Sequence, residues 1–177
     1  MATHILLTGL PGCGKTTLVR RIIEQLGDLQ LAGFYTQERR GSDGRRTGFQ
    51  AMGLKGASIM LADVRSKSRV RVARYGVELP AFEQFLQDEL NCGPGEVDLF
   101  VVDEVGKMER CSQRFIELVG ALLDGDVSVL STVAMKGGGF IADVKERNDV
   151  ELVKVHNNNR DRLVSDLVKR LRHSVHG

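Results

Sequence analysis

Cysteine is scarce in this sequence, and its spacing indicates neither crosslinks nor a zinc site. Of 177 residues only Cys13, Cys92 and Cys111 are cysteines, an odd number with no two in a CxxC spacing. Neither a disulfide framework nor a cysteine zinc site is therefore indicated, and we expect a reducing, cytoplasmic environment. The four histidines show no metal-ligand spacing either, and we interpret them as structural or surface residues.

Long hydrophobic runs are also missing. No apolar stretch approaches the roughly 20 residues needed to cross a bilayer, so no membrane partner is expected. The N-terminal sequence MATHILLTG has neither a basic region nor a long apolar region, and we do not expect it to act as a secretion signal. Its apolar residues 5–7 predict a first strand instead.

The chain has little net charge, with 25 Lys and Arg against 23 Asp and Glu and a formal charge of +2. This balance argues against a wholly basic nucleic-acid binder and against an acidic disordered tail. The charge is unevenly distributed, however. Residues 39–74, which we call the cationic segment, hold ten basic and two acidic residues for a net of +8, and the remainder has a net of −6.

What the sequence does contain is an alternation of apolar strands and amphipathic helices. Length and a hydrophobic content of 42% suit a single domain over residues 1–177, which we expect to be a monomer. Helical spacing predicts helices from residue 15 to 26, from Pro80, after Ser112, and over 160–173. Strands are expected at 5–7, 31–36, 59–61, 69–72, 99–102, 127–133 and 150–155, with a hairpin turn at 41–44. The order predicts an α/β three-layer sandwich with a mostly parallel sheet and a β-rich hairpin insertion over about 34–76.

A phosphate-binding loop follows the first strand. The sequence GLPGCGKT over Gly9–Thr16 matches GxxxxGK[ST] between a predicted strand and a predicted helix, the context that this motif requires. Glycines let the backbone turn its N–H groups toward phosphate oxygens, Lys15 reaches the β- and γ-phosphates, and the Thr16 hydroxyl binds Mg²⁺. The predicted nucleotide-binding residues here are Gly9, Leu10, Pro11, Gly12, Cys13, Gly14, Lys15, Thr16 and Thr17.

Two adjacent carboxylates end the apolar run at 99–102. The C-terminal ends of strands are where open α/β sheets bind ligands, and we expect Asp103 to hold Mg²⁺ directly or through water. Glu104 could then activate an attacking water as a general base. A metal-binding carboxylate next to a carboxylate that acts as a general base favours hydrolysis by an activated water over transfer of the phosphoryl group to a bound acceptor. Lys107, three residues later, is a candidate for neutralising phosphate charge or a surface lysine.

The cationic segment allows three interpretations. Its charges could form a solvated face, contact the phosphates or base of a nucleotide, or bind nucleic acid. Binding of nucleic acid stays possible but is not the favoured interpretation. An arginine in this segment could neutralise transition-state charge on the γ-phosphate. Spacing alone selects none of them.

Several longer segments occur in a distinctive order. They are TGLPGCGKTTL (8–18), GFYTQERR (33–40), RRTGF (45–49), FEQF (82–85), VVDEVGKME (101–109) and NNNRDRL (157–163). In this combination the sequence resembles the THEP1-type nucleoside-triphosphatases over nearly its whole length. The pair DEVGKME and GFYTQE is far more specific than the loop motif alone, because most P-loop proteins lack both.

The resemblance implies a P-loop NTPase fold and Mg²⁺-dependent hydrolysis of ATP, GTP and other nucleoside triphosphates. It implies that the loop and Asp103, Glu104, Val105, Gly106, Lys107 and Met108 lie at the nucleotide, and it supports Glu104 and Lys15 as catalytic residues. The chain departs from the family's usual GT-hydrophobic-P at residues 131–134, which read STVA, and Ala73 replaces a common glycine. Thr132 is retained, and we expect it to contact the γ-phosphate.

The first hypothesis is therefore a slow, broad-specificity nucleoside-triphosphatase with Mg²⁺ as cofactor and nucleoside triphosphates as its partners. A nucleotide or nucleoside kinase, in which the cationic hairpin shapes an acceptor site, is the second. A nucleotide-dependent module that binds RNA or DNA is the third. The guanine-selecting NKxD stretch is absent, since residues 157–160 read NNNR, which argues against a small regulatory GTPase.

Overall fold

The computed structural model describes residues 2–93 and 95–176. The strands are β1 (His4–Thr8), β2 (Leu31–Arg40), β3 (Arg46–Gly53), β4 (Ser58–Asp63), β5 (Arg71–Val72), β6 (Tyr75–Val77), β7 (Leu99–Val105), β8 (Ser128–Val133) and β9 (Val150–Lys154). The helices are α1 (Lys15–Gln25), α2 (Leu79–Leu90), α3 (Gln113–Leu123), α4 (Phe140–Glu146) and α5 (Arg160–His176), with a 3-10 turn η1 (Glu109–Cys111) before α3.

All nine strands form one sheet in the order β5-β6-β4-β3-β2-β7-β8-β1-β9. The five strands from β2 to β9 in that order pair in parallel. Strands β3, β4, β6 and β5 continue the sheet in antiparallel fashion, and we call them the antiparallel extension. The mostly parallel sheet and its hairpin-rich insertion are therefore as the sequence predicts.

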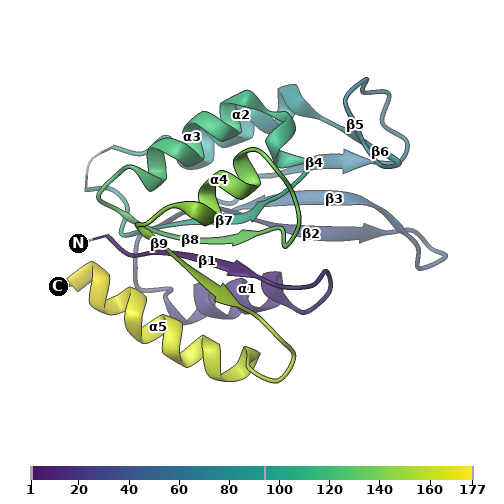
Figure 1. Ribbon diagram of the computed structural model, residues 1–177. Coiled ribbons are helices and arrows are strands. Elements are labelled where there is room, and N and C mark those ends of the chain that lie inside the picture. The colour runs from purple at the N-terminus through teal and green to yellow at the C-terminus, as the bar shows by residue number, and fades with distance from the viewer. Residues whose placement is uncertain (1, 94, 177) are drawn as a thin grey trace.

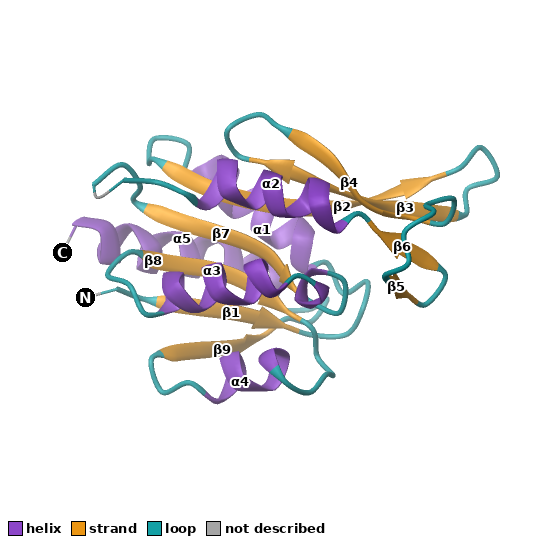
Figure 2. Ribbon diagram, turned by 90° about the horizontal axis from the view of Figure 1, so that it is seen from above, coloured by secondary structure: helices purple, strands orange, loops and turns teal. Residues whose placement is uncertain are grey.

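Helices cover the sheet on both faces, as Figures 1 and 2 show: α2, α3 and α4 lie on one side and α1 and α5 on the other. The strand β7 explains this arrangement. Its neighbours alternate between two apolar clusters, with Leu99 and Val101 packed toward α1 and α5 and Phe100 and Val102 packed toward α2, α3 and α4. A strand buried on both faces needs a continuous apolar sequence. The three-layer α/β sandwich is confirmed.

The structure differs from the expected elements mainly in its short strands and helices and in the positions of some element ends. The strand expected at 69–72 is only Arg71–Val72, and it pairs with β6, which the pattern did not reveal. The helix α4 was missed, because its seven residues follow a glycine-rich loop and span too few turns for a helical period to be detected. The helix expected from Pro80 begins one residue earlier, and β7 continues past Asp103 to Val105.

The turn between β5 and β6 contains Ala73 in a left-handed conformation, with a φ of 51°. A Cβ atom is disfavoured there by about 1 kcal/mol, whereas glycine adopts it freely. We expect Ala73→Gly to raise the free energy of unfolding by up to about 1 kcal/mol, measured by chemical denaturation. The same replacement at exposed Ala57, where φ is not positive, should lower it. Equal losses at both positions would contradict this account of the turn.

The parallel strands all point their C-terminal ends toward one edge of the sheet. The loop after β1, the end of β7 and the loop after β8 therefore meet there, although they are far apart in sequence. Within the described residues, no helix is both long enough and apolar enough to cross a membrane.

Candidate functional site

The loop between β1 and α1 has the backbone shape that the glycine motif predicts. Gly12 and Gly14 have φ values of 77° and 93°, and Gly14 caps the N-terminus of α1. The Lys15 ammonium folds back over this loop and donates hydrogen bonds to the carbonyl oxygens of Gly9 (3.1 Å) and Leu10 (3.3 Å). Its charge and the N-terminal end of α1 are thus held at the same place, which favours an anion.

Asp103 connects three elements at the edge of the sheet. One carboxylate oxygen, Oδ2, accepts hydrogen bonds from the Thr16 hydroxyl at 2.8 Å and the Thr36 N–H at 3.2 Å. The other, Oδ1, accepts one from the Thr132 hydroxyl at 2.5 Å. Asp103 is only 1% exposed, and burial raises the pKa of its carboxyl although these donors and Lys15 oppose the shift.

Glu104 is paired with a second carboxylate that sequence reasoning did not single out. A Cβ atom on Gly106 would lie 2.8 Å from both Glu104 Oε1 and Glu109 Oε2, so the two carboxyl groups flank this glycine. Glu109 is buried. Burial raises the pKa of each group, and each is raised further by its carboxylate neighbours. The only sequence signal for Glu109 was its place at the end of VVDEVGKME.

A cavity of about 880 Å³ lies between the phosphate loop and the antiparallel extension. This volume is in the range of ligand pockets. Of the residues predicted to contact nucleotide, those that line it are Gly9, Leu10, Pro11, Gly12, Gly14, Lys15, Thr16, Thr17, Glu104, Lys107 and Met108. Residues that line it without having been predicted are Thr36, Gln37, Glu38, Arg46, Phe49, Val72, Glu109, Ala134, Met135 and Lys136.

The remaining predicted residues lie behind the wall of the cavity or beside it. Asp103, Val105 and Thr132 are buried under its surface, and Gly106 is buried between the two glutamates. Thr132 was expected to reach the γ-phosphate, but its hydroxyl is directed at Asp103, because the end of β8 lies beside the end of β7. Cys13 lines a smaller neighbouring hollow with His156 and Asn157.

Comparison with known proteins identifies the family to which this arrangement belongs. A family model described as NTPase matches residues 4–168. The chain is also 36% identical to the nucleoside-triphosphatase THEP1 of Thermotoga sp. (strain RQ2) over 168 residues, which cover 95% of each chain. The chain belongs to the THEP1-type nucleoside-triphosphatase family. The resemblance stated from the motifs is therefore confirmed, and with it the expected enzyme class.

Solved structures of relatives have the same fold. The crystal structure of THEP1 from Aquifex aeolicus matches with a TM-score of 0.87 at 31% identity, covering 96% of this chain and 99% of the relative. The solution structure of a human cancer-related nucleoside triphosphatase matches with a TM-score of 0.82 at 35% identity, covering 98% and 99%. The P-loop NTPase sandwich is thus a property of the family.

The positive charges at the cavity come from separate parts of this THEP1-type fold. Lys15 belongs to the phosphate loop, Lys107 follows β7, Lys136 follows β8, and Arg46 begins β3. Three acidic side chains, Glu38, Glu104 and Glu109, line the same cavity. The cavity is therefore not uniformly positive, and the position of each cation relative to these carboxylates decides what it can bind.

Proposed function

We propose that the protein hydrolyses nucleoside 5′-triphosphates to the diphosphate and phosphate, with Mg²⁺ as cofactor. The observation that carries this proposal is the contact of 2.8 Å between the Thr16 hydroxyl and Asp103, beside a Glu104 that lines the same cavity. A hydroxyl from the phosphate loop, a strand-end carboxylate and a neighbouring base are the groups that this hydrolysis needs. Membership of the nucleoside-triphosphatase family supports it.

The oxygen atoms around Asp103 fit a magnesium ion. Proteins usually hold Mg²⁺ through one or two carboxylates together with water and substrate phosphates, and Thr16 and Asp103 offer one hydroxyl and one carboxylate. Across residues 2–93 and 95–176, no group of three or more His, Cys, Asp and Glu could hold a metal, so a cage made of protein side chains alone does not fit. The bound ion would offset negative charge on the β- and γ-phosphates.

Glu104 would act as the general base in this reaction. Its carboxylate accepts a proton from a water whose oxygen bonds to the γ-phosphorus while the bond to the β–γ bridging oxygen breaks. Burial and the charge of Asp103 raise the pKa of Glu104, although Lys15 lowers it. A raised pKa makes the carboxylate a stronger base at neutral pH. Lys15 and the loop N–H groups hold the phosphates meanwhile.

We also propose broad base specificity. The phosphate loop offers the Lys15 ammonium, the Thr16 hydroxyl and its backbone N–H groups, and such groups recognise phosphates that every nucleoside triphosphate shares. The chain also lacks the NKxD stretch that selects guanine in small GTPases.

A phosphate-release panel tests the proposal. We expect release from ATP, GTP, CTP, UTP and their deoxy forms at rates within about tenfold of one another, and loss of release when EDTA removes Mg²⁺. A protein preparation carrying Lys15→Ala serves as the control for contaminating phosphatases.

Each part of the proposal has its own contrary result. Release from a single nucleotide would overturn broad specificity, and release unaffected by EDTA would overturn the metal requirement. Diphosphate formation that depends on an added nucleoside or metabolite would favour a kinase. Nucleic-acid-stimulated hydrolysis whose stimulation falls steeply with salt would favour the nucleic-acid module.

A further inference from the structure

Of the ten basic residues in the cationic segment, Arg46 is the one that lines the cavity among the described residues. The other nine do not line it, and several of them have partners elsewhere. Arg40 donates to Glu38 at 2.7 Å and to the Gly44 carbonyl at 2.9 Å. Lys55 donates to the Asp88 carbonyl of α2 at 2.8 Å. The tertiary structure thus separates one arginine from nine similar residues.

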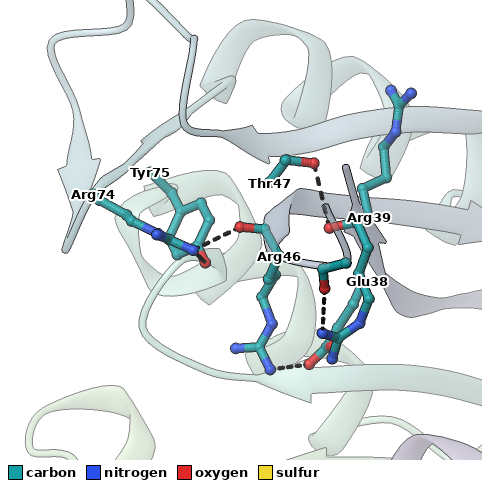
Figure 3. A network of polar contacts seen from close by, with 8 residues as sticks. Glu38, Arg39, Arg46, Thr47, Arg74 and Tyr75 are labelled. Atoms are coloured by element: carbon teal, nitrogen blue, oxygen red, sulfur yellow. Dashed lines mark hydrogen bonds and ion pairs between the residues drawn. The ribbon is translucent and has the colours of Figure 1, made fainter. Parts of the chain in front are cut away.

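Arg46 is held in place by contacts on several sides (Figure 3). Its guanidinium forms an ion pair with Glu38, drawn in Figure 3. It also lies over the ring of Phe49, 5.4 Å from the centroid. Its backbone carbonyl accepts a hydrogen bond of 2.6 Å from Arg74. Figure 3 also shows Arg39 extending away from this pair, as expected for a neighbour of Glu38 on a strand. The strand pleat and these partners therefore direct Arg46 toward the cavity.

The charge balance of this cluster leaves Arg46 able to bind an anion. Glu38 accepts from both Arg40 and Arg46, so one carboxylate is shared by two guanidinium groups and the three residues together carry a net positive charge. The Arg46 side chain is 42% exposed, and Glu38 occupies only part of its planar set of N–H donors. A guanidinium matches phosphate oxygens better than an ammonium does, because it can donate two parallel hydrogen bonds.

The opposite wall of the cavity is where phosphates are expected. The cavity that Arg46 lines is also lined by Lys15, Thr16 and Glu104. Thr36, which donates its N–H to Asp103, lies on the same strand as Glu38, two residues before it. The strand β2 therefore connects the expected metal-binding carboxylate to the Glu38–Arg46 pair.

We propose that Arg46 donates hydrogen bonds to the γ-phosphate of the nucleotide and neutralises the negative charge of the transferred phosphoryl group in the transition state. This inference rests on the proposed hydrolysis. In the absence of nucleotide, Glu38 holds the guanidinium at the cavity wall. The bound phosphate then competes with Glu38 for its N–H donors.

The test compares Arg46→Ala with Arg45→Ala. Arg45 is the adjacent residue, 83% exposed at its side chain, and its ion-pair partner is Asp43, so the control removes the same charge outside the cavity. We expect Arg46→Ala to lower kcat for Mg-ATP about 100-fold or more, as loss of a transition-state donor does, and Arg45→Ala to stay within twofold of wild type. Arg46→Lys should recover only part of the loss, because an ammonium cannot replace the fork of donors.

Two further measurements separate this role from a structural one. The wild type should bind ADP much more tightly when aluminium fluoride is present, since the adduct resembles the transition state, and Arg46→Ala should lose that gain while binding ADP alone normally. Guanidinium ion added in solution should restore part of the activity of Arg46→Ala and should not affect Arg45→Ala.

The contrary results are distinct. If the wild type hydrolyses nucleotides and Arg46→Ala and Arg46→Lys both keep kcat within twofold, the role of Arg46 is overturned and the proposed function stands. An equal loss of ADP binding with and without aluminium fluoride would overturn it as well. If the wild type releases no phosphate from any nucleotide, the proposed function itself is wrong.

Discussion

Glu104→Gln is expected to lower kcat for nucleoside triphosphate hydrolysis about 10³-fold while leaving nucleotide affinity almost unchanged. The amide has nearly the same shape as the carboxylate and can still hold a water, but it cannot accept the proton. The Glu104 side chain lines the cavity without being one of the partners that fix Asp103, so Thr16, Thr36 and Thr132 should remain in place. The loss should therefore fall on the chemical step.

Single-turnover phosphate release and equilibrium nucleotide binding, measured on the same preparations, check this expectation. Glu117→Gln makes the same chemical change on the exposed face of α3 and should behave as wild type. Turnover within about threefold of wild type would remove Glu104 from the role of base. Loss of binding together with turnover would mean that Glu104 holds the nucleotide instead.

The pH dependence of kcat/KM, which reports ionisations of the free enzyme, gives a second check on the same residue. A general base must be ionised to work, so wild-type kcat/KM should fall as the pH drops through the pKa of Glu104. Burial and the charge of Asp103 raise that pKa above the ordinary 4.5, so the fall should begin at a higher pH than for an exposed glutamate. In Glu104→Gln this acidic limb should disappear from the residual activity.

Lys15→Ala is expected to lower kcat/KM by about 10³-fold or more, and here nucleotide binding should weaken as well as turnover. The Lys15 ammonium does two things at once. It donates to the carbonyl oxygens of Gly9 and Leu10, and it supplies the positive charge at the N-terminal end of α1. Removing it leaves the loop without its side-chain hydrogen bonds and the phosphates without their cation.

Titration calorimetry with the diphosphate and steady-state hydrolysis together measure the two losses. Lys169→Ala, on the exposed surface of α5, is the matched control and should change neither quantity. Lys15→Arg should not restore function, because a larger planar group does not fit the place of a compact point charge. Normal diphosphate affinity in Lys15→Ala would contradict the assignment of the loop as the phosphate site.

The contrast between these two variants follows from their positions. In the proposed reaction Lys15 binds phosphates, which are charged before and during the reaction, so its loss should affect the ground state and the transition state alike. In the same proposal Glu104 acts on a proton that moves only during the reaction. A result in which both variants lose binding equally would show that the two residues share one structural role.

The local sequence pattern was enough to predict those parts of the site that consist of consecutive residues. The phosphate loop is eight adjacent residues, and its shape follows from glycines that accept positive φ and from the helix that starts at Lys15. The position of Asp103 near the C-terminal end of β7 followed from the continuous apolar run before it, although the strand itself continues to Val105. Short elements such as α4 and β6 lacked enough turns or alternations for such a pattern to be detected.

The sequence by itself determined the α/β class, the phosphate loop and the two strand-end carboxylates, because each depends on backbone preferences and side-chain periodicity over a few neighbouring residues. Only the tertiary structure decided which distant groups surround them. Thr36 and Thr132 reach Asp103 from 67 and 29 residues away, and Arg46 alone of ten similar cations enters the cavity wall among the described residues. The order of strands in the sheet and the alternation of side chains along each strand bring these partners together. Neither can be predicted from the spacing of residues within a single segment.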